Sequence, residues 1–418
     1  MSCTESTTTF KGTTSRDPTS SVAEEEQKQH LESLPYYHRR LNRTDAVFIL
    51  NRSGDFLLRK TSTGGELAVT VLWQEQIMHF PVKKSGEGYC FEGKAFASIP
   101  ELINWHRTYK VPLTRETGAI LKDPKHMTSW ELLTNELIVV RKLCPGEFGD
   151  NYIGNLVHRE DASVKPIAIK TMSAGTKSNG KGLDAMREVV LREARILRDL
   201  NDHPHIARCY GITTDSVDGH VLTAMELVSG GRLDNRLRAS PPLTPSRKQQ
   251  LAVAAIRAVL HVHCHDYIHR NICAKNFLVE LNEQKDVVAL KLIGFHFAQQ
   301  VDENGTFSGA TTDRMPTLSH TAPEALATYQ WTKQSDVWSW AVLVWEIFCN
   351  GARPYQSDIP AEKSSHAESF LQTLQKRVRL APQSDMNETL LQIWKKCFEE
   401  APSNRPTSYK IMRQLTEN

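Results

Sequence analysis

The chain lacks long apolar runs, paired cysteines and a strong net charge, and each shortage excludes a class of protein. Its 418 residues contain no run of about 18 apolar residues, so we expect no integral membrane segment. The eight cysteines form no CxxC pair, which indicates reduced thiols in the cytosol rather than a disulfide framework. A formal net charge of only +3 gives no reason to expect nucleic acid as a partner.

The N-terminal segment contains few residues that could form an apolar core. Met1-Ser2-Cys3 begins no apolar signal sequence and places no glycine after the initiator methionine, so neither secretion nor myristoylation is expected. Residues 1–30 are rich in Ser, Thr, Glu and Gln and poor in large apolar residues. Burial in such a segment cannot offset the entropy of ordering it, so we predict a disordered tail over 1–30.

The remaining sequence predicts two modules of the α+β class. Short strand-like runs between two helical runs predict a small antiparallel sheet flanked by two helices over 34–122. A polar linker is predicted over 123–136, followed by a second module over 137–418. In the second module a β-rich part, 137–225, precedes a mostly helical part, 229–418, which is consistent with two lobes around a cleft.

The first module carries an arginine inside an apolar run, Gly54-Asp55-Phe56-Leu57-Leu58-Arg59-Lys60-Thr61. Solubility explains such an arginine poorly, whereas its planar fork of donors matches the oxygens of a phosphate group. Hydroxyl donors follow at Thr61, Ser62 and Thr63. The pattern predicts an anion pocket with Arg59 at its floor, and a surface arginine on a strand is the alternative.

This run resembles the strand of SH2 domains that carries their buried arginine. Tyr36-Tyr37-His38 and Met78-His79-Phe80 extend the resemblance over the module, although Tyr36 stands where Trp is usual. The resemblance implies that Arg43 and His79 line the pocket beside Arg59. It also implies that the module binds phosphotyrosine-containing proteins.

The start of the second module partly resembles the glycine-rich loop of protein kinases. Gly146 and Gly149 permit close approach of backbone amides to phosphates, but Cys144 replaces the first glycine of the motif. Lys170 ends a strand-like run and matches the lysine that holds the α- and β-phosphates, with Glu193 as its expected partner on the next helix. Two unrelated surface charges are the alternative.

The same resemblance predicts an adenine pocket. Ala168 and Leu278 would enclose the base, and Met225 would be the gatekeeper at the start of a hinge that runs through Glu226 to Val228. ATP is therefore the predicted cofactor. The residues expected to stack between the lobes are Leu197, His269 and Phe295.

The most specific landmark is Ile268-His269-Arg270-Asn271-Ile272-Cys273-Ala274-Lys275-Asn276, which resembles the catalytic loop of tyrosine kinases. Arg270 and Asn276 match that loop, but Asn271 stands where the family has an aspartate. An amide can orient a hydroxyl group but cannot usefully accept its proton. Loss of a general base typically costs about 10²- to 10⁴-fold in rate.

A second acid is missing from Lys291-Leu292-Ile293-Gly294-Phe295-His296, which aligns with the segment that carries the magnesium aspartate. Gly294 offers no side-chain oxygen, so Asn276 would be the remaining metal ligand. His296 suits zinc or copper better than magnesium. Binding of Mg²⁺ therefore stays open.

Structural positions of the kinase pattern are present, in contrast to the chemical ones. Glu324 and Arg405 are expected to form a buried ion pair, and Asp336 is expected to brace the catalytic loop. No tyrosine lies between Phe295 and Glu324, so activation by phosphorylating a tyrosine there is not expected.

From Leu34 onward the chain resembles the SH2-plus-kinase half of the Fer/Fes non-receptor tyrosine kinases, in a short form like the single-SH2 kinases of nematodes. Phe91-Glu92-Gly93 and Met225-Glu226-Leu227-Val228 carry this likeness. We predict a cytoplasmic phosphotyrosine-binding signalling protein whose pseudokinase domain acts as a scaffold or allosteric regulator. An active tyrosine kinase is a further predicted partner, and recruitment to membrane-proximal phosphotyrosine sites is expected. The alternatives are a slow protein-tyrosine kinase and a kinase-like domain that binds no nucleotide.

Overall fold

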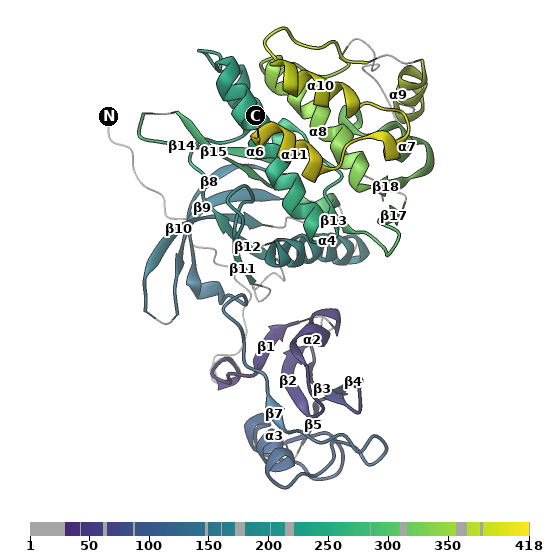
Figure 1. The fold of residues 1–418 in the computed structure, drawn as a ribbon. Helices are drawn as coiled ribbons and strands as arrows, with labels where there is room; N and C mark the ends of the chain where they lie inside the picture. Colours follow the sequence, from purple (N-terminus) through teal and green to yellow (C-terminus); the bar gives the residue numbers. More distant parts are fainter. Residues whose placement is uncertain are drawn as a thin grey trace, which may run out of the picture. The chain divides into compact units, whose positions relative to one another are not determined.

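The computed structural model describes residues 30–417, with gaps at 42, 62–64, 87, 147–148, 160, 172–179, 201, 214–220, 285, 310–315, 357–365 and 377–378. The predicted disordered tail therefore lies outside the described residues, except for His30. The chain divides into two compact units, Met1–Glu131 and Leu132–Asn418 (Figure 1). This division falls within the segment 123–136 that the sequence predicts as a linker.

The first unit is a sheet flanked by two helices. Its elements are β1 (Tyr37–Arg40), α2 (Arg43–Ile49), β2 (Asp55–Lys60), β3 (Leu67–Trp73), β4 (Gln76–Pro81), β5 (Lys83–Ser85), β6 (Gly88–Cys90), α3 (Ile99–Thr108) and β7 (Asp123–Pro124). The order β1-β2-β3-β4 is antiparallel from β2 to β4, as predicted. The sequence did not indicate that β1 and β7 also pair with β2, both in parallel.

Local signals explain where α3 begins and what it covers. The Ser98 hydroxyl accepts a hydrogen bond from the Glu101 amide, and a proline occupies the first turn, where its missing N–H costs nothing. One face of α3 buries Leu102 and Ile103 against the sheet core of Phe56, Leu58 and Val69. This apolar core holds β2 rigidly, and β2 is the strand that carries Arg59.

The second unit begins with a five-stranded antiparallel sheet in the order β11-β12-β10-β9-β8. Its elements are η1 (Thr134–Glu136), β8 (Leu137–Pro145), β9 (Asp150–Val157), β10 (Val164–Thr171), α4 (Gly180–Asp199), β11 (Cys209–Thr213) and β12 (Leu222–Glu226). The alternation of buried Ile167 and Ile169 with Ala168 and Lys170 turns the latter pair to the opposite face of β10. Both of these residues line the cleft described below.

The rest of the second unit is mainly helical. Its helices are α5 (Leu233–Arg238), α6 (Pro245–Cys264), α7 (Pro323–Thr328), α8 (Lys333–Phe348), α9 (His366–Gln375), α10 (Glu388–Lys396) and α11 (Ser408–Thr416), with short turns η2 (Ala274–Asn276), η3 (Phe295–Phe297), η4 (Leu318–His320) and η5 (Pro402–Asn404). Its strands are β13 (Tyr267–Ile268), β14 (Phe277–Leu281), β15 (Val287–Leu292), β16 (Gln299–Gln300), β17 (Thr306–Ser308) and β18 (Gln330–Thr332). Figure 1 shows β8–β12 gathered on one side of this unit and α6, α8, α10 and α11 on the other.

Helix α8 forms the centre of the helical part. It is apolar around most of its circumference, and Trp338 and Trp340 are fully buried. The Trp340 indole donates to the Ala252 carbonyl, and the Trp394 indole donates to the Ala341 carbonyl, so the buried N–H groups join α8 to α6 and α10. The predicted α+β fold class is confirmed, and in the second unit a β-rich lobe precedes this helical lobe in the chain.

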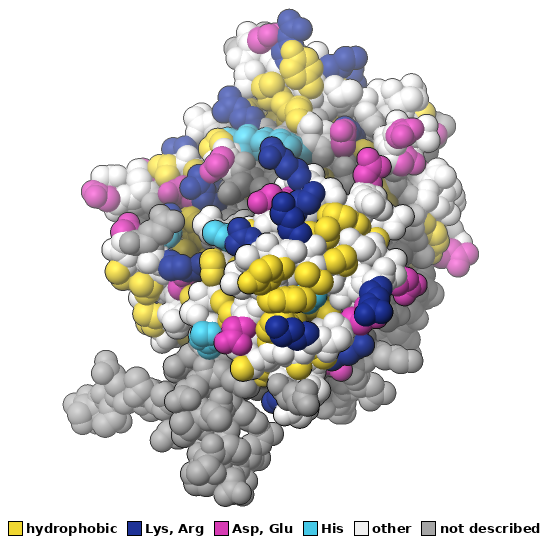
Figure 2. Space-filling view, turned by 90° about the horizontal axis from the view of Figure 1, so that it is seen from below, with side chains coloured by type: hydrophobic (Ala, Val, Ile, Leu, Met, Phe, Trp, Pro, Cys, Tyr) yellow, Lys and Arg dark blue, Asp and Glu magenta, His cyan; other side chains and the backbone are white. Residues whose placement is uncertain are grey.

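The surface agrees with the low net charge of the sequence. On the face shown in Figure 2, basic and acidic side chains are interspersed among hydrophobic ones. Within the part of the chain that the structure describes, no helix is both long and apolar enough to cross a bilayer.

Candidate functional sites

A cleft of about 480 Å³ lies between the β-rich and the helical parts of the second unit. It brings together residues that are far apart in the sequence. The predicted site residues in its lining are Gly146, Ala168, Lys170, Glu193, Met225, Glu226, Asn276, Leu278 and Gly294. Gly149, Val228, Arg270 and Asn271 are not in this lining.

Lys170 and Glu193 meet inside the cleft, as expected. The Lys170 Nζ lies 2.5 Å from Glu193 Oε2, joining the end of β10 to α4. Burial opposes ionisation of Glu193, but the charges of Lys170 and His296 outweigh it and keep its pKa below the ordinary value. The Glu193 carboxylate therefore stays charged and holds the Lys170 ammonium at the cleft wall.

The turn between β8 and β9 has a real requirement for glycine at position 146. The Gly146 amide donates to the Gly149 carbonyl at 2.6 Å, and a Cβ on Gly146 would lie 2.7 Å from that same oxygen. Cys144 is exposed beside the turn, and the side-chain nitrogen of Asn151, Nδ2, lies 3.7 Å from the sulfur of Cys144. Glu147 and Phe148 lie outside the described residues.

The loop that carries Asn271 is braced as the sequence predicts. Asp336 on α8 accepts hydrogen bonds from the backbone amides of His269, at 2.7 Å, and Arg270, at 2.8 Å. Burial acts against ionisation of Asp336, but its hydrogen bond and charge interaction with His263 lower the pKa overall. The charged carboxylate also stabilises the left-handed backbone of Arg270, whose φ is 68°.

Asn271 itself points a donor into a buried position. Its Oδ1 accepts from the Thr317 amide at 3.1 Å and from the Cys273 thiol, which fixes the orientation of the carboxamide. Its Nδ2 is buried and has no hydrogen-bond partner among the described residues. Asn271 thus presents an N–H where an aspartate would present its second acceptor oxygen.

Gly294 leaves a space that Asn276 fills. Gly294 adopts a left-handed conformation, with φ 81° and ψ 43°, at the start of η3. A Cβ at this position would lie 2.7 Å from Asn276 Oδ1 and 2.9 Å from its Cγ. The Asn276 Nδ2 donates to the Asn271 carbonyl at 2.8 Å, so this carboxamide is held in place.

The cleft does not provide a set of protein ligands that fits Mg²⁺. Its two carboxylates are already engaged, Glu193 with Lys170 and Glu226 with Lys291 at 2.9 Å. The oxygen of Asn276 is then the one remaining ligand that the sequence predicts. Among the described residues, no group of three His, Cys, Asp or Glu side chains is placed to hold a metal ion.

Two of the three residues expected to stack between the lobes are in contact through their rings. Leu197 and Phe295 are buried, and the rings of Phe295 and His269 lie 4.7 Å apart in an edge-on arrangement. Burial lowers the pKa of His269 to about 4, so the imidazole is neutral at physiological pH. Sequence reasoning missed Lys291, because nothing in the alternation of β15 marks it as the partner of Glu226.

In the first unit, the guanidinium of Arg59 is buried and bonded to neighbouring strands and loops. Arg59 is 2% exposed, and it donates to Thr70 Oγ1 and to the Leu41 carbonyl, each at 2.9 Å. Thr70 is bonded in turn to His79 at 2.9 Å. Burial is the larger cause, and the charge of Arg43 the smaller, of a lowered pKa for Arg59. Among the described residues, neither arginine has a carboxylate partner.

Arg43 and His79 lie close to Arg59, so the three side chains predicted to bind phosphate are neighbours in the first unit. Burial and the two arginine charges lower the pKa of His79 to about 4, which leaves the imidazole neutral at physiological pH. The Thr61 amide is engaged with the Glu66 carbonyl at 2.7 Å. Ser62 and Thr63, the other predicted hydroxyl donors, lie outside the described residues.

Comparison with known proteins follows the same division of the chain. The family model "Protein tyrosine and serine/threonine kinase" matches residues 137–415, and the model "SH2 domain" matches residues 36–106. Tyrosine-protein kinase Fer of Homo sapiens is 30% identical over 384 residues, covering 91% of this chain and 43% of Fer. Fer-related kinase 1 of Caenorhabditis elegans is 28% identical over 398 residues, covering 93% of this chain and 94% of that protein. The chain thus spans less than half the length of human Fer.

Proposed function

The chain belongs to the protein tyrosine and serine/threonine kinase family, with an SH2 domain in front, and from this premise we propose that it is a phosphotyrosine-binding signalling protein with a pseudokinase domain. The observation that carries the proposal is the pair of carboxamides in the cleft. Asn271 directs a donor where a proton acceptor is needed, and Asn276 occupies the space above Gly294.

The missing acceptor has a direct chemical consequence. In the family's reaction a carboxylate orients the tyrosine hydroxyl and takes its proton. The Asn271 amide does neither well, because its oxygen is already bonded to the Thr317 amide and its nitrogen can only donate. General-base loss alone accounts for about 10²- to 10⁴-fold in rate, which corresponds to roughly 3–5 kcal/mol of barrier.

We further propose that the cleft binds ATP without needing a metal. Lys170, held by Glu193, supplies a positive charge for the α- and β-phosphates, and Ala168 and Leu278 supply apolar contacts for the base. Met225 and the hinge through Glu226 to Val228 would complete the adenine pocket. When bound to a nucleotide, Mg²⁺ would supply charge neutralisation, but no protein carboxylate in the cleft is free to hold it.

The SH2 domain would provide the connection to partners. A phosphotyrosine dianion beside Arg59 would meet two arginines, Arg59 and Arg43, for which the described residues provide no carboxylate partner. We propose that the chain acts in the cytoplasm, where phosphotyrosine proteins and an active tyrosine kinase are its partners, and that these recruit it to membrane-proximal sites. The kinase domain would then serve as a scaffold or allosteric regulator.

A slow protein-tyrosine kinase is the second candidate, and a specific observation favours it. The Lys170–Glu193 pair is formed and the catalytic loop is braced by Asp336, which is the arrangement of an assembled kinase. The relatives found by comparison are named tyrosine-protein kinases.

Purified full chain incubated with labelled ATP, Mg²⁺ or Mn²⁺ and a tyrosine-rich polymer tests the proposal, with Lys170→Met as the control. We expect no transfer above the control, together with binding of a fluorescent ATP analogue that survives EDTA. Transfer that disappears in Lys170→Met would overturn the pseudokinase proposal and establish the slow kinase. Absence of nucleotide binding, with phosphopeptide binding intact, would leave the kinase domain as a ligand-free scaffold.

A further inference from the structure

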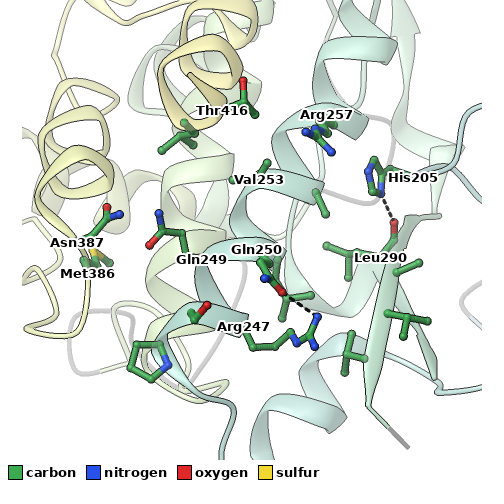
Figure 3. A pocket seen from close by; sticks show the side chains of 18 of the residues that line it. His205, Arg247, Gln249, Gln250, Val253, Arg257, Leu290, Met386, Asn387 and Thr416 are labelled. Carbon is green, nitrogen blue, oxygen red and sulfur yellow. Dashed lines mark hydrogen bonds between the residues drawn. The ribbon is translucent and has the colours of Figure 1, made fainter. Parts of the chain in front are cut away.

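A groove of about 860 Å³ lies in the helical part of the second unit and shares no lining residue with the nucleotide cleft. Figure 3 shows α6 running through it, with β15 and His205 on one side and Met386 and Asn387, just before α10, on the other. The end of α11, at Thr416, closes the top of this view. The groove plays no part in the function proposed above.

Two arginines mark the ends of a stripe along α6. Arg247, Gln250, Ala254 and Arg257 recur at intervals of three and four residues, so they share one face of the helix. All four line the groove. The two arginines are ten residues apart, which corresponds to roughly 15 Å along the helix axis.

Neither arginine has a carboxylate partner in the described part of the chain. Arg247 donates to Gln250 Oε1 at 2.8 Å, and Arg257 is exposed beside His205 (Figure 3). The acid in the lining, Asp385, is bonded to Lys248 at 3.1 Å and so is already neutralised. The groove therefore carries two uncompensated positive charges.

Apolar side chains also line the groove. Val288 on β15 is 54% exposed, and Val253, Met386 and Leu415 contribute further apolar surface. An exposed valine and buried or partly buried apolar residues beside two arginines form a surface that is neither purely apolar nor purely electrostatic. A complementary ligand has acidic groups at both ends and apolar groups between them.

We propose that this groove docks an extended acidic segment of a partner protein, with carboxylates at Arg247 and Arg257 and apolar side chains over Val288 and Val253. A single phosphate or carboxylate is too short to reach both arginines. A nucleic acid would bring a continuous row of phosphates to a groove in which, among the described residues, two arginines without a carboxylate partner are separated by apolar and amide side chains. A peptide spans the stripe with five residue steps of roughly 3.3 Å each.

The docking site does not depend on whether the kinase domain transfers phosphate. It gives the second unit a contact with a protein partner that needs no phosphotyrosine. Because the first unit is proposed to bind phosphotyrosine, a partner that carries both features would be held at two points, which raises its apparent affinity without any new contact at either site.

Fluorescence polarisation with the full chain tests the proposal. The probe is a fluorescein-labelled octapeptide with two glutamates at each end of a Leu-Ala-Val-Leu core. The variant is Arg247→Glu with Arg257→Glu, and the matched control is Lys395→Glu with Lys396→Glu, which makes the same change in net charge at exposed positions on α10 outside the groove. Thermal unfolding of each variant checks that it is folded.

We expect saturable binding that weakens with salt, and that the Arg247/Arg257 variant weakens about ten- to a hundredfold while the control changes less than about twofold. Val288→Ser should weaken binding without changing its salt dependence. Binding that is equal in the two charge variants would overturn the proposal, as would no saturable binding up to a millimolar concentration. Displacement of the probe by a phosphotyrosine peptide would assign it to the Arg59 pocket instead, and equal affinity for an oligouridine would refute the choice of a peptide. If the double variant unfolds, Arg257→Gln alone replaces it.

Discussion

Replacing Gly294 tests whether the lost acid can simply be put back. Alanine at position 294 must adopt a φ near 81° and must share space with the Asn276 carboxamide, whose Oδ1 lies 2.7 Å from the new Cβ. A left-handed conformation costs a non-glycine residue about 1–2 kcal/mol. Moving Asn276 away also breaks its bond to the Asn271 carbonyl, which adds about 1 kcal/mol. We therefore expect Gly294→Ala to lower the free energy of unfolding by about 2–3 kcal/mol.

Gly305 provides a matched control. Its φ of 73° is also left-handed, but a Cβ there would have no atom within 4 Å. Gly305→Ala should therefore show the conformational cost alone, about 1–2 kcal/mol. The difference between the two variants isolates the contact with Asn276, and in an Asn276→Gly background this difference should vanish.

Urea unfolding followed by circular dichroism measures these free energies. If Gly294→Ala and Gly305→Ala are equally destabilised, the Asn276 carboxamide moves freely and the reasoning is refuted. The same geometry predicts the outcome of restoration. Asn271→Asp alone should stay inactive, and Asn271→Asp with Gly294→Asp should gain Mg²⁺-dependent transfer only together with lower stability. Strong transfer by Asn271→Asp alone would contradict the role given to Gly294.

Three further predictions concern other parts of the chain. Arg59→Lys, which keeps the charge but loses the bidentate fork, should weaken phosphotyrosine-peptide binding by about 2 kcal/mol or more in isothermal titration calorimetry, and undiminished affinity would place the phosphate elsewhere. His79 has a pKa of about 4 in the folded chain and about 6.5 in the unfolded chain, so between these pH values only the unfolded chain binds the extra proton. Stability should therefore fall as the pH is lowered from 6.5 towards 4, and thermal unfolding of His79→Gln should show a smaller fall. An unchanged pH profile in this variant would assign the fall to other groups. Arg405→Ala leaves the Glu324 carboxylate without its bidentate partner, and should lower the free energy of unfolding by about 3–5 kcal/mol, whereas a loss below about 1 kcal/mol would mean that solvent screens the pair.

The sequence predicted those contacts that follow from motif order. Lys170 and Glu193 are 23 residues apart, and Glu324 and Arg405 are 81 apart, yet both pairs form as expected because each residue sits in a recognisable pattern. The bracing of the catalytic loop by Asp336 was predicted in the same way and is confirmed. The division into a small α+β domain and a two-lobed domain was predicted from the strand and helix patterns together with the order of the motifs.

Contacts that depend on side-chain geometry could not be predicted. Two of them, the position of Asn276 over Gly294 and the buried N–H of Asn271, arise from the orientation of carboxamides, which no spacing encodes. The parallel pairing of β1 and β7 with β2 depends on how distant segments return to one strand. The groove along α6 is likewise formed by elements that meet only in the folded chain.

The buried charge of Arg59 makes the first unit's lifetime depend on its surroundings. Because the described residues place no carboxylate beside Arg59, the folded unit carries an electrostatic cost that a bound phosphotyrosine, as proposed above, would remove. Ligand present at a hundred times its dissociation constant adds about 2.7 kcal/mol to the stability of the folded form. Because proteases degrade the unfolded fraction, the proposed binding would lengthen the survival of the protein in cells rich in tyrosine phosphorylation. The amount of this protein in a cell would then rise with the phosphotyrosine content of that cell and would follow changes in it slowly.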